Sequence, residues 1–328
     1  MKHISILVPR GNVALSCIEG SFTFFNKVND FLADKGRSPL FKVQLVGIDN
    51  EPQLYHKLFK VYPDLTIDTL SKTDLIIIPA INGNMEEVIE TNRAFIPWIK
   101  EQHNSGAEVA SLCVGAFLLA STGLLNGRRC ATHWIAANDF RKMFPDVNLV
   151  SEKIITDEQG IYSSGGANSF LNLILYLIEK HAGRDMSIFC AKVFEVELER
   201  ESQSSFIIFE GQKDHDDDAV KKAQEYIESN FKEKITIDQL ASMVALSRRN
   251  LERRFKKATS NTTAEYIQRV KIEAAKISLE SSKENVNEVM YKVGYSDTKA
   301  FRNTFKRFTG LSPIEYRNKY TRQTLAVF

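Results

Sequence analysis

The sequence feature that most limits the possible folds of this chain is a pattern written twice near its C-terminus. The two copies occupy residues 244–266 and 293–316. Phe255 and Phe305 are 50 positions apart, and so are Tyr266 and Tyr316. A repeat at a fixed period of this size indicates a duplicated supersecondary unit.

Each copy predicts a helix, a tight turn and a second helix. A small residue, Ala245 in the first copy and Gly294 in the second, stands where the turn of a helix-turn-helix requires one. Ser247 and Ser296 follow these residues and are positioned to cap the second helix.

The second helix of each copy has a narrow apolar face and a broad polar one. The spacing of Leu251 with Phe255, and of Phe301 with Phe305, predicts one buried stripe per helix. The outward side chains that we expect to contact DNA are Arg248, Arg249, Glu252, Arg253 and Lys256 in the first copy, and Thr298, Lys299, Arg302, Asn303 and Lys306 in the second. Such a face suits a major groove, because guanidinium groups pair with guanine, Asn pairs with adenine and Lys neutralises phosphate.

Two other interpretations of the duplicated segment stay open. The charges could be ordinary solvated side chains on small helical hairpins, or the hairpins could be protein-interaction repeats. Both explain the concentrated positive charge less well than DNA binding does.

The charge of the chain is divided between its two ends. From Ala219 onward 22 Lys and Arg face 12 Asp and Glu, which gives +10, whereas the residues before Ala219 carry −8. This division is expected when one domain alone binds nucleic acid. Four cysteines lack the spacing of a metal site or a disulfide scaffold, and neither a signal peptide nor an apolar membrane span is present, so we expect a cytoplasmic protein without a metal or another cofactor.

The first two hundred residues alternate between strand and helix patterns. Strands are expected at 4–8, 41–46, 74–79, 107–112, 149–155 and 161–164, and helices at 22–32, 86–102, 115–121 and 170–180. Pro97 should kink or break the helix in which it lies. This alternation predicts an α/β domain with a mostly parallel sheet covered by helices on both faces.

An acidic tract separates the two halves. Residues 211–218 contain no apolar side chain, so we expect a flexible linker there, between a domain at 1–210 and an all-α domain at 219–328. Metal binding by His215 and its acidic neighbours is the alternative for this tract.

A cysteine turn is the stretch of the first domain that most resembles a chemical site. A predicted buried strand leads directly to Cys113, and Gly115 allows a sharp turn into a helix, as in a nucleophile elbow. The helix start would favour a thiolate or a bound anion. His133, twenty residues later, is a candidate imidazole partner.

The C-terminal segment resembles a known family. Residues 219–320, with their duplicated units and the closing stretch from Gly310 to Tyr316, resemble the AraC/XylS-type DNA-binding domain. The resemblance implies a long central helix at 263–281 between two helix-turn-helix units. Carried over by position, it implies base contacts by Arg249, Glu252 and Arg253, and by Thr298, Lys299 and Asn303.

Residues 1–190 resemble the ThiJ/PfpI branch of the class I glutamine amidotransferase-like fold, which is flavodoxin-like. The matching stretches are those at 113–116, 123–127 and 132–134, and they are similar to those of GlxA-like transcription regulators. The resemblance implies dimerisation through this domain, and it favours a small-molecule pocket lined by Cys113, His133, Asn82 and Asn168.

The sequence departs from the enzymes of that family in two places. Cys17 stands where their acidic residue is expected, with Glu19 two positions away, and Ala80-Ile81 replaces a Gly-Gly pair that would supply oxyanion donors. We therefore expect a degenerate catalytic site. Inert, packed roles for Cys113 and His133 are the alternative to a pocket.

Together these observations predict a DNA-binding transcription regulator. Its partners would be double-stranded DNA, an unknown small-molecule effector and a second copy of the chain. Two rival hypotheses are a cysteine-dependent hydrolase or amidase with an appended DNA-binding domain, and an architectural protein without a ligand.

Overall fold

The computed structural model describes residues 1–198 and 202–321, so the end of the expected second domain, residues 322–328, lies outside the described part. The chain divides into two compact units, Met1–Gln203 and Ser204–Phe328. Among the described residues, no helix combines the length and the apolar character that crossing a bilayer requires.

The first unit is built on a seven-stranded sheet in the order β12-β13-β9-β7-β1-β3-β6. Every neighbouring pair is parallel except β12 with β13. The strands are β1 (Lys2–Leu7), β3 (Phe41–Gly47), β6 (Leu65–Thr66), β7 (Leu75–Ile78), β9 (Glu108–Leu112), β12 (Ile155–Asp157) and β13 (Ile161–Ser164). All four residues of β7 are buried, as expected for a central strand covered on both faces.

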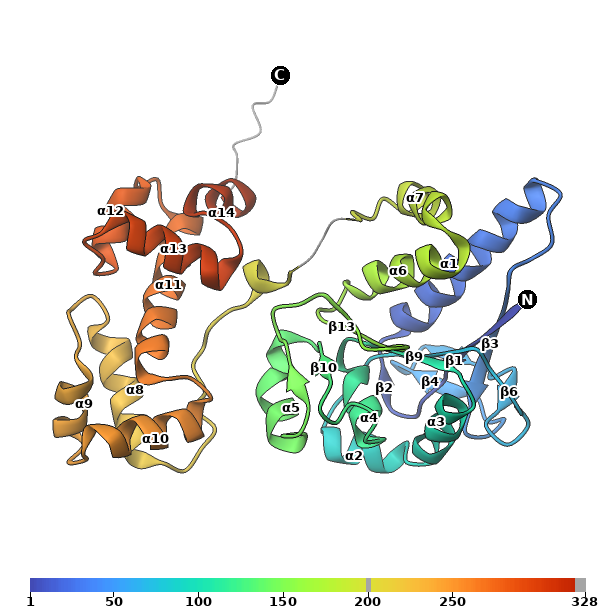
Figure 1. The fold of residues 1–328 in the computed structure, drawn as a ribbon, viewed down its shortest axis with the longest axis horizontal. Coiled ribbons are helices and arrows are strands. Elements are labelled where there is room, and N and C mark those ends of the chain that lie inside the picture. Colours follow the sequence, from blue (N-terminus) through green and yellow to red (C-terminus); the bar gives the residue numbers. More distant parts are fainter. Residues whose placement is uncertain (199–201, 322–328) are drawn as a thin grey trace, which may run out of the picture. The chain divides into compact units, whose positions relative to one another are not determined.

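Helices cover both faces of this sheet (Figure 1). One face carries α1 (Leu15–Asp34), α6 (Phe170–Ala182) and α7 (Arg184–Val193), and the other carries α2 (Met85–Thr91), α3 (Phe95–Asn104) and α4 (Ala116–Ser121). The expected α/β, flavodoxin-like architecture is confirmed.

Shorter elements complete the first unit. The helix α5 (Ala137–Met143) lies beside β11, and three two-stranded ladders pair β2 (Asn12–Val13) with β8 (Ile81–Asn82), β4 (Gln53–Tyr55) with β5 (Phe59–Val61), and β10 (Arg129–Cys130) with β11 (Asn148–Leu149).

The single helix expected at 86–102 is two helices, α2 and α3. The break lies at Asn92, whose side chain accepts from Arg10 N (2.8 Å) and donates to Arg10 O (3.0 Å). Pro97 does not cause it, because this residue lies in the first turn of α3, where a missing N–H costs no helical hydrogen bond.

The second unit is entirely helical among the residues described. Its helices are α8 (Asp218–Asn230), α9 (Ile237–Met243), α10 (Arg248–Thr259), α11 (Thr263–Ser281), α12 (Val286–Lys292), α13 (Thr298–Thr309) and α14 (Pro313–Tyr320). Two apolar clusters, one around Leu251, Phe255 and Tyr266 and the other around Phe301, Phe305 and Tyr316, correspond to the two sequence copies.

The turns and caps of the two copies also correspond, with one exception. Ala245 and Gly294 both adopt left-handed conformations, with φ of +53° and +76°. Ser247 caps α10 as expected, but the cap of α13 is Asp297, not Ser296. The inserted residue of the second copy therefore lies in its turn, before the cap.

The acidic tract at 211–218 differs from the expected linker. The division between the units lies at Gln203, and the tract belongs to the second unit, where Lys213 pairs with Glu228 (2.7 Å) and Asp217 pairs with Arg254 (2.6 Å). The tract contains no apolar residue, but its polar groups find partners on α8, on α10 and at Asn261 in the turn before α11, which no local pattern predicts.

His215 also has partners other than a metal. Its ring contacts Gln224 Oε1 (2.9 Å) and accepts from Asp217 N (3.2 Å). Within residues 1–198 and 202–321, no group of three His, Cys, Asp or Glu side chains is arranged as a metal site would require.

Candidate nucleic-acid interface and candidate ligand pocket

The helices α10 and α13 have matching buried and exposed faces. Leu251, Phe255 and Thr259 are buried in α10, and residues 50 positions later are buried in α13. Each helix ends in a threonine whose hydroxyl bonds to its own last turn: Thr259 Oγ1 and Thr309 Oγ1 each donate to the carbonyl four residues earlier at 2.8 Å.

The ten residues expected to contact DNA lie outside the core. Eight of them are exposed, and Glu252 and Thr298 are half-buried. Arg253 donates to Asn250 Oδ1 (3.0 Å) on its own helix, which leaves the rest of its guanidinium accessible. Asn303 is also exposed. The structure therefore leaves the side chains that the sequence predicts to contact DNA at the surface.

Arg254 has a different environment from Arg253. Its Nε and Nη2 donate to the two carboxylate oxygens of Asp217, at 2.7 and 2.6 Å. Hydrogen bonding from Arg254 lowers the pKa of the Asp217 carboxyl, which also caps α8 through Val220 N. This arginine joins α10 to α8, a structural role that the sequence analysis did not identify.

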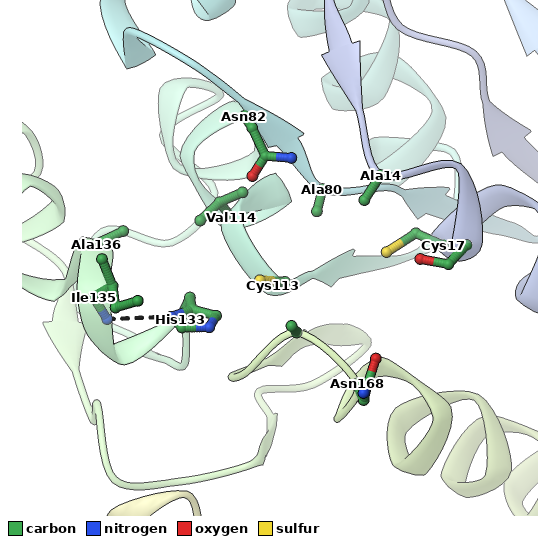
Figure 2. Close-up of a pocket in the computed structure, with 12 residues that line it drawn as sticks. Ala14, Cys17, Ala80, Asn82, Cys113, Val114, His133, Ile135, Ala136 and Asn168 are labelled. Carbon is green, nitrogen blue, oxygen red and sulfur yellow. Dashed lines mark hydrogen bonds between the residues drawn. The ribbon is translucent and has the colours of Figure 1, made fainter. Parts of the chain in front are cut away.

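The first unit contains a cavity of about 300 Å³. Cys113, His133, Asn82 and Asn168, the four residues predicted for a pocket, all line it. Figure 2 shows Cys113 between Cys17 and His133, with Asn82 and Asn168 on opposite sides. The remaining lining residues are Ala14, Ser16, Ala80, Val114, Ile135, Ala136 and Ala167.

The fold explains why these residues meet. Most of them lie in segments that follow β1, β7, β9 and β13, and parallel strands have their carboxyl ends at one edge of the sheet. His133, Ile135 and Ala136 follow β10 instead, a strand outside the main sheet. Cys113 starts the short 3₁₀ turn η1 (Cys113–Gly115) with φ of +54°. A Cβ on Gly115 would lie 2.6 Å from Pro79 O, so the close approach of this turn to the backbone after β7 requires glycine here.

Burial decides the protonation state of Cys113. Only 6% of this residue is exposed, and burial raises the pKa of its thiol to about 12, with a further increase from nearby Cys17. Cys17 itself has its pKa raised by burial to about 11. Burial outweighs the N–H groups of the helix start, so the protonated thiol is favoured over the expected thiolate.

His133 is not engaged with the thiol. Its Nδ1 accepts from Ile135 N (3.2 Å) at the start of η2 (Trp134–Ala136), and burial lowers the pKa of its imidazole. No hydrogen bond joins it to Cys113 among the contacts of the described residues. Glu19 is exposed and accepts from Thr23 Oγ1 (2.6 Å), and no acidic side chain within residues 1–198 and 202–321 lines the cavity.

Comparison with known proteins agrees with this two-part structure. Residues 33–180 match the DJ-1/PfpI family model, and residues 240–319 match the model of a helix-turn-helix domain. The chain joins a DJ-1/PfpI domain to a helix-turn-helix domain.

Curated relatives align with most of the length of this chain. The HTH-type transcriptional regulator GbdR of Pseudomonas aeruginosa is 25% identical, over 85% of this chain and 75% of its own length. The HTH-type transcriptional regulator GlxA of Rhizobium meliloti is 24% identical, over 65% of this chain and 66% of its own. A solved structure of an AraC family transcriptional regulator from Pseudomonas putida is similar in fold, with a TM-score of 0.51 and 14% identity, over 59% of this chain and all of that one (100%).

Proposed function

We propose that this protein is a sequence-specific, double-stranded-DNA-binding transcription regulator whose first unit binds a small-molecule effector. The observation that carries the proposal is the pair α10 and α13, two helices with the same buried register and exposed faces rich in Arg, Lys and Asn. The two helices would enter successive major-groove segments, about 34 Å apart.

The exposed side chains divide by the chemistry that they offer. Arg249, Arg253 and Lys299 would read guanine edges, Asn303 would read adenine, and Glu252 would accept from cytosine. Arg248, Lys256, Arg302 and Lys306 would bind phosphate, and Thr298 would hydrogen-bond to a base or to the backbone.

The pocket favours an effector without positive charge. Among the described residues that line it, none carries a charged side chain, since both cysteines have raised pKa values and His133 has a lowered one. A buried ammonium without a carboxylate partner would be costly. Asn82, Asn168 and His133 offer hydrogen bonds, and Ile135, 67% exposed at the cavity, offers an apolar contact to an occupant.

The same geometry argues against hydrolase activity. A working cysteine nucleophile needs a thiolate, a base within hydrogen-bond reach and an oriented partner for that base. A protonated thiol and an imidazole engaged by Ile135 N do not meet these needs. A cavity of small-molecule size likewise favours a sensor over an architectural protein without a ligand. Dimerisation through the first unit remains part of the proposal.

The adjacent Arg253 and Arg254 test the DNA-binding proposal. Arg253→Ala should weaken binding to a selected duplex by about 1–3 kcal/mol and relax the preference at one base pair, because an edge contact is lost. Arg254→Ala should lower the melting temperature and leave base preference unchanged, because its guanidinium is held by Asp217. Binding measured on selected and random duplexes checks both, and equal losses on the two duplexes for Arg253→Ala would show a phosphate contact.

The pocket is tested by thermal shift with a metabolite library. We expect stabilising compounds to lack positive charge, and Ala167→Trp, which places an indole at the exposed edge of the cavity, to abolish their effect. Stabilisation by ammonium compounds alone, or shifts that persist in Ala167→Trp, would contradict this assignment.

A further inference from the structure

Gln203, the last residue of the first unit, is buried and fixed by hydrogen bonds. Only 1% of it is exposed. Its backbone N donates to Glu152 O (2.9 Å), and its side-chain Nε2 donates to Thr132 O (2.9 Å) and Lys153 O (3.2 Å). A surface residue at a domain boundary would need none of these bonds.

The Gln203 amide lies against two backbone segments that form the pocket. On one side is Thr132, which precedes His133 and whose Oγ1 donates to Cys113 O at 3.1 Å. On the other side is the loop of Gly165 and Gly166, which leads into the lining residues 167 and 168. A Cβ on Gly165 would lie 2.2 Å from Gln203 Nε2, so this loop and the amide are in close contact.

One atom of the amide lacks a partner among the described residues. Gln203 Oε1 is buried and accepts no hydrogen bond, although a Cβ on Gly166 would lie only 3.5 Å from it. A buried, unpaired acceptor is costly. A shift of the Gly165–Gly166 loop that turns one of its N–H groups toward Gln203 Oε1 would give this oxygen a hydrogen bond.

The chain enters the second unit immediately after Gln203. Ser205 O accepts from Tyr320 OH (2.9 Å), and Ile207 O accepts from the buried Lys276 Nζ (2.5 Å). Phe209 N donates to Glu273 Oε2 (3.1 Å) on α11, the helix that joins the two helix-turn-helix units.

The chain between the hydrogen bonds of Gln203 and those of the segment that starts at Ser205 is short. Gln203 and Ser205 are two residues apart, and two extended residues span about 7 Å. A long flexible linker could change its conformation when Gln203 moves, and Ser205 would stay in place. With a connection this short, a displacement of Gln203 must also displace Ser205.

We propose that Gln203 is a positioning residue that transmits occupancy of the pocket to the DNA-binding unit. The proposal rests on the proposed function above. A ligand that moves the segments at 132–133 or 165–168 displaces the Gln203 amide. The displacement then strains the hydrogen bonds that Ser205, Ile207 and Phe209 make within the DNA-binding unit. Because coupling between two sites is reciprocal, bound DNA must also change the pocket.

This reciprocity allows a test without a known effector. The full-length chain selects a duplex from a random pool, and the rate at which iodoacetamide alkylates Cys113 is followed by peptide mass spectrometry with and without that duplex. In the wild-type chain the duplex should change the rate about fivefold or more, within the usual range of coupling. In Gln203→Met, which keeps the volume and removes the amide donors, the rate should be the same with and without DNA.

Gln102 provides a matched control in the same unit. It is also buried, with 4% exposed, and its amide also joins backbone groups: Nε2 donates to Ser71 O (3.2 Å), and Oε1 accepts from Thr73 N (3.0 Å). Gln102→Met should keep the full effect of DNA on Cys113. If Gln203→Met fails to fold, Gly-Gly is inserted after Gln203 instead. This insertion lengthens the connection and keeps the hydrogen bonds on both sides, and it should abolish the effect of DNA on the Cys113 alkylation rate.

The outcomes separate this proposal from the proposed function. An unchanged Cys113 rate in the wild-type chain on its selected duplex would overturn the coupling and leave DNA binding in place. An effect of DNA that persists in Gln203→Met, or is lost equally in Gln102→Met, would also overturn it. Failure to select any duplex would refute the proposed function itself.

Discussion

At the scale of single residues, the two helix-turn-helix turns use the same conformation with different side chains. Ala245 has φ of +53° where the second copy has Gly294 at +76°. A left-handed conformation costs a non-glycine residue about 1–2 kcal/mol. The positions are not interchangeable, because a Cβ on Gly294 would lie 2.2 Å from Lys232 O, whereas Ala245 is exposed.

Ala245→Gly should therefore raise the free energy of unfolding by about 0.5–1 kcal/mol. This gain is the conformational strain that the substitution removes, reduced by the entropy that glycine adds to the unfolded chain. Urea unfolding measures the change. Ala300→Gly, at an exposed position inside α13, is the control and should lower stability by about 0.5–1 kcal/mol. Destabilisation by Ala245→Gly would show that its φ is not a source of strain.

At the scale of elements, the start of each recognition helix is set by one capping side chain. Ser247 accepts from Asn250 N (3.3 Å), and Asp297 accepts from Ala300 N (2.5 Å). These caps are 50 residues apart, as are the buried residues of the two helices, whereas Ala245 and Gly294 are 49 apart. The recognition helices thus keep their register although the preceding turns differ in length.

Asp297→Ala should cost about 1 kcal/mol of stability, because the N–H of residue 300 loses its acceptor and a negative charge leaves a helix N-terminus. The neighbouring Ser296→Ala should change stability little, since Ser296 does not cap the helix. Thermal unfolding of the two variants distinguishes them, and a larger loss for Ser296→Ala would place the cap one residue earlier.

At the scale of the whole molecule, the second unit depends on the segment that precedes its first helix. Phe209 packs against Tyr266, with ring centroids 5.1 Å apart, and Gln212 Oε1 accepts from Asn261 Nδ2 (2.9 Å). Asp217 caps α8. The unit therefore begins at Ser204, well before the helical pattern becomes visible in the sequence.

A fragment of residues 204–328 should fold cooperatively, and one of residues 219–328 should be less stable by at least about 3 kcal/mol. The shorter fragment loses a half-buried aromatic ring, the Asp217 cap of α8 and the bonds of Asp217 to Arg254, which are worth about that much together. Circular dichroism during heating compares the two fragments. Equal melting temperatures would mean that the segment lies on the unit without stabilising it.

The residues by themselves determined the features that depend on near neighbours. The spacing of Leu251 with Phe255 sets the buried face of α10. The central helix at 263–281, which the resemblance to a family implied, is α11 (Thr263–Ser281). Residue patterns also predicted most of the sheet strands. Residue patterns singled out Cys113 and His133, whereas their grouping with Asn82 and Asn168 in one pocket came from resemblance to a family, because the four lie in separate segments that no periodicity connects.

Only the tertiary structure decided the state of the pocket and the place where the units join. The pKa of Cys113 depends on how much protein surrounds its thiol, and the partners of Gln203 lie about 50 and 70 residues earlier in the chain. The acidic tract was expected to be a linker because its own residues cannot form a core. It is held by α8, by α10 and by Asn261 in the turn before α11, because long-range hydrogen bonds and ion pairs depend on residues that are distant in sequence and close in space.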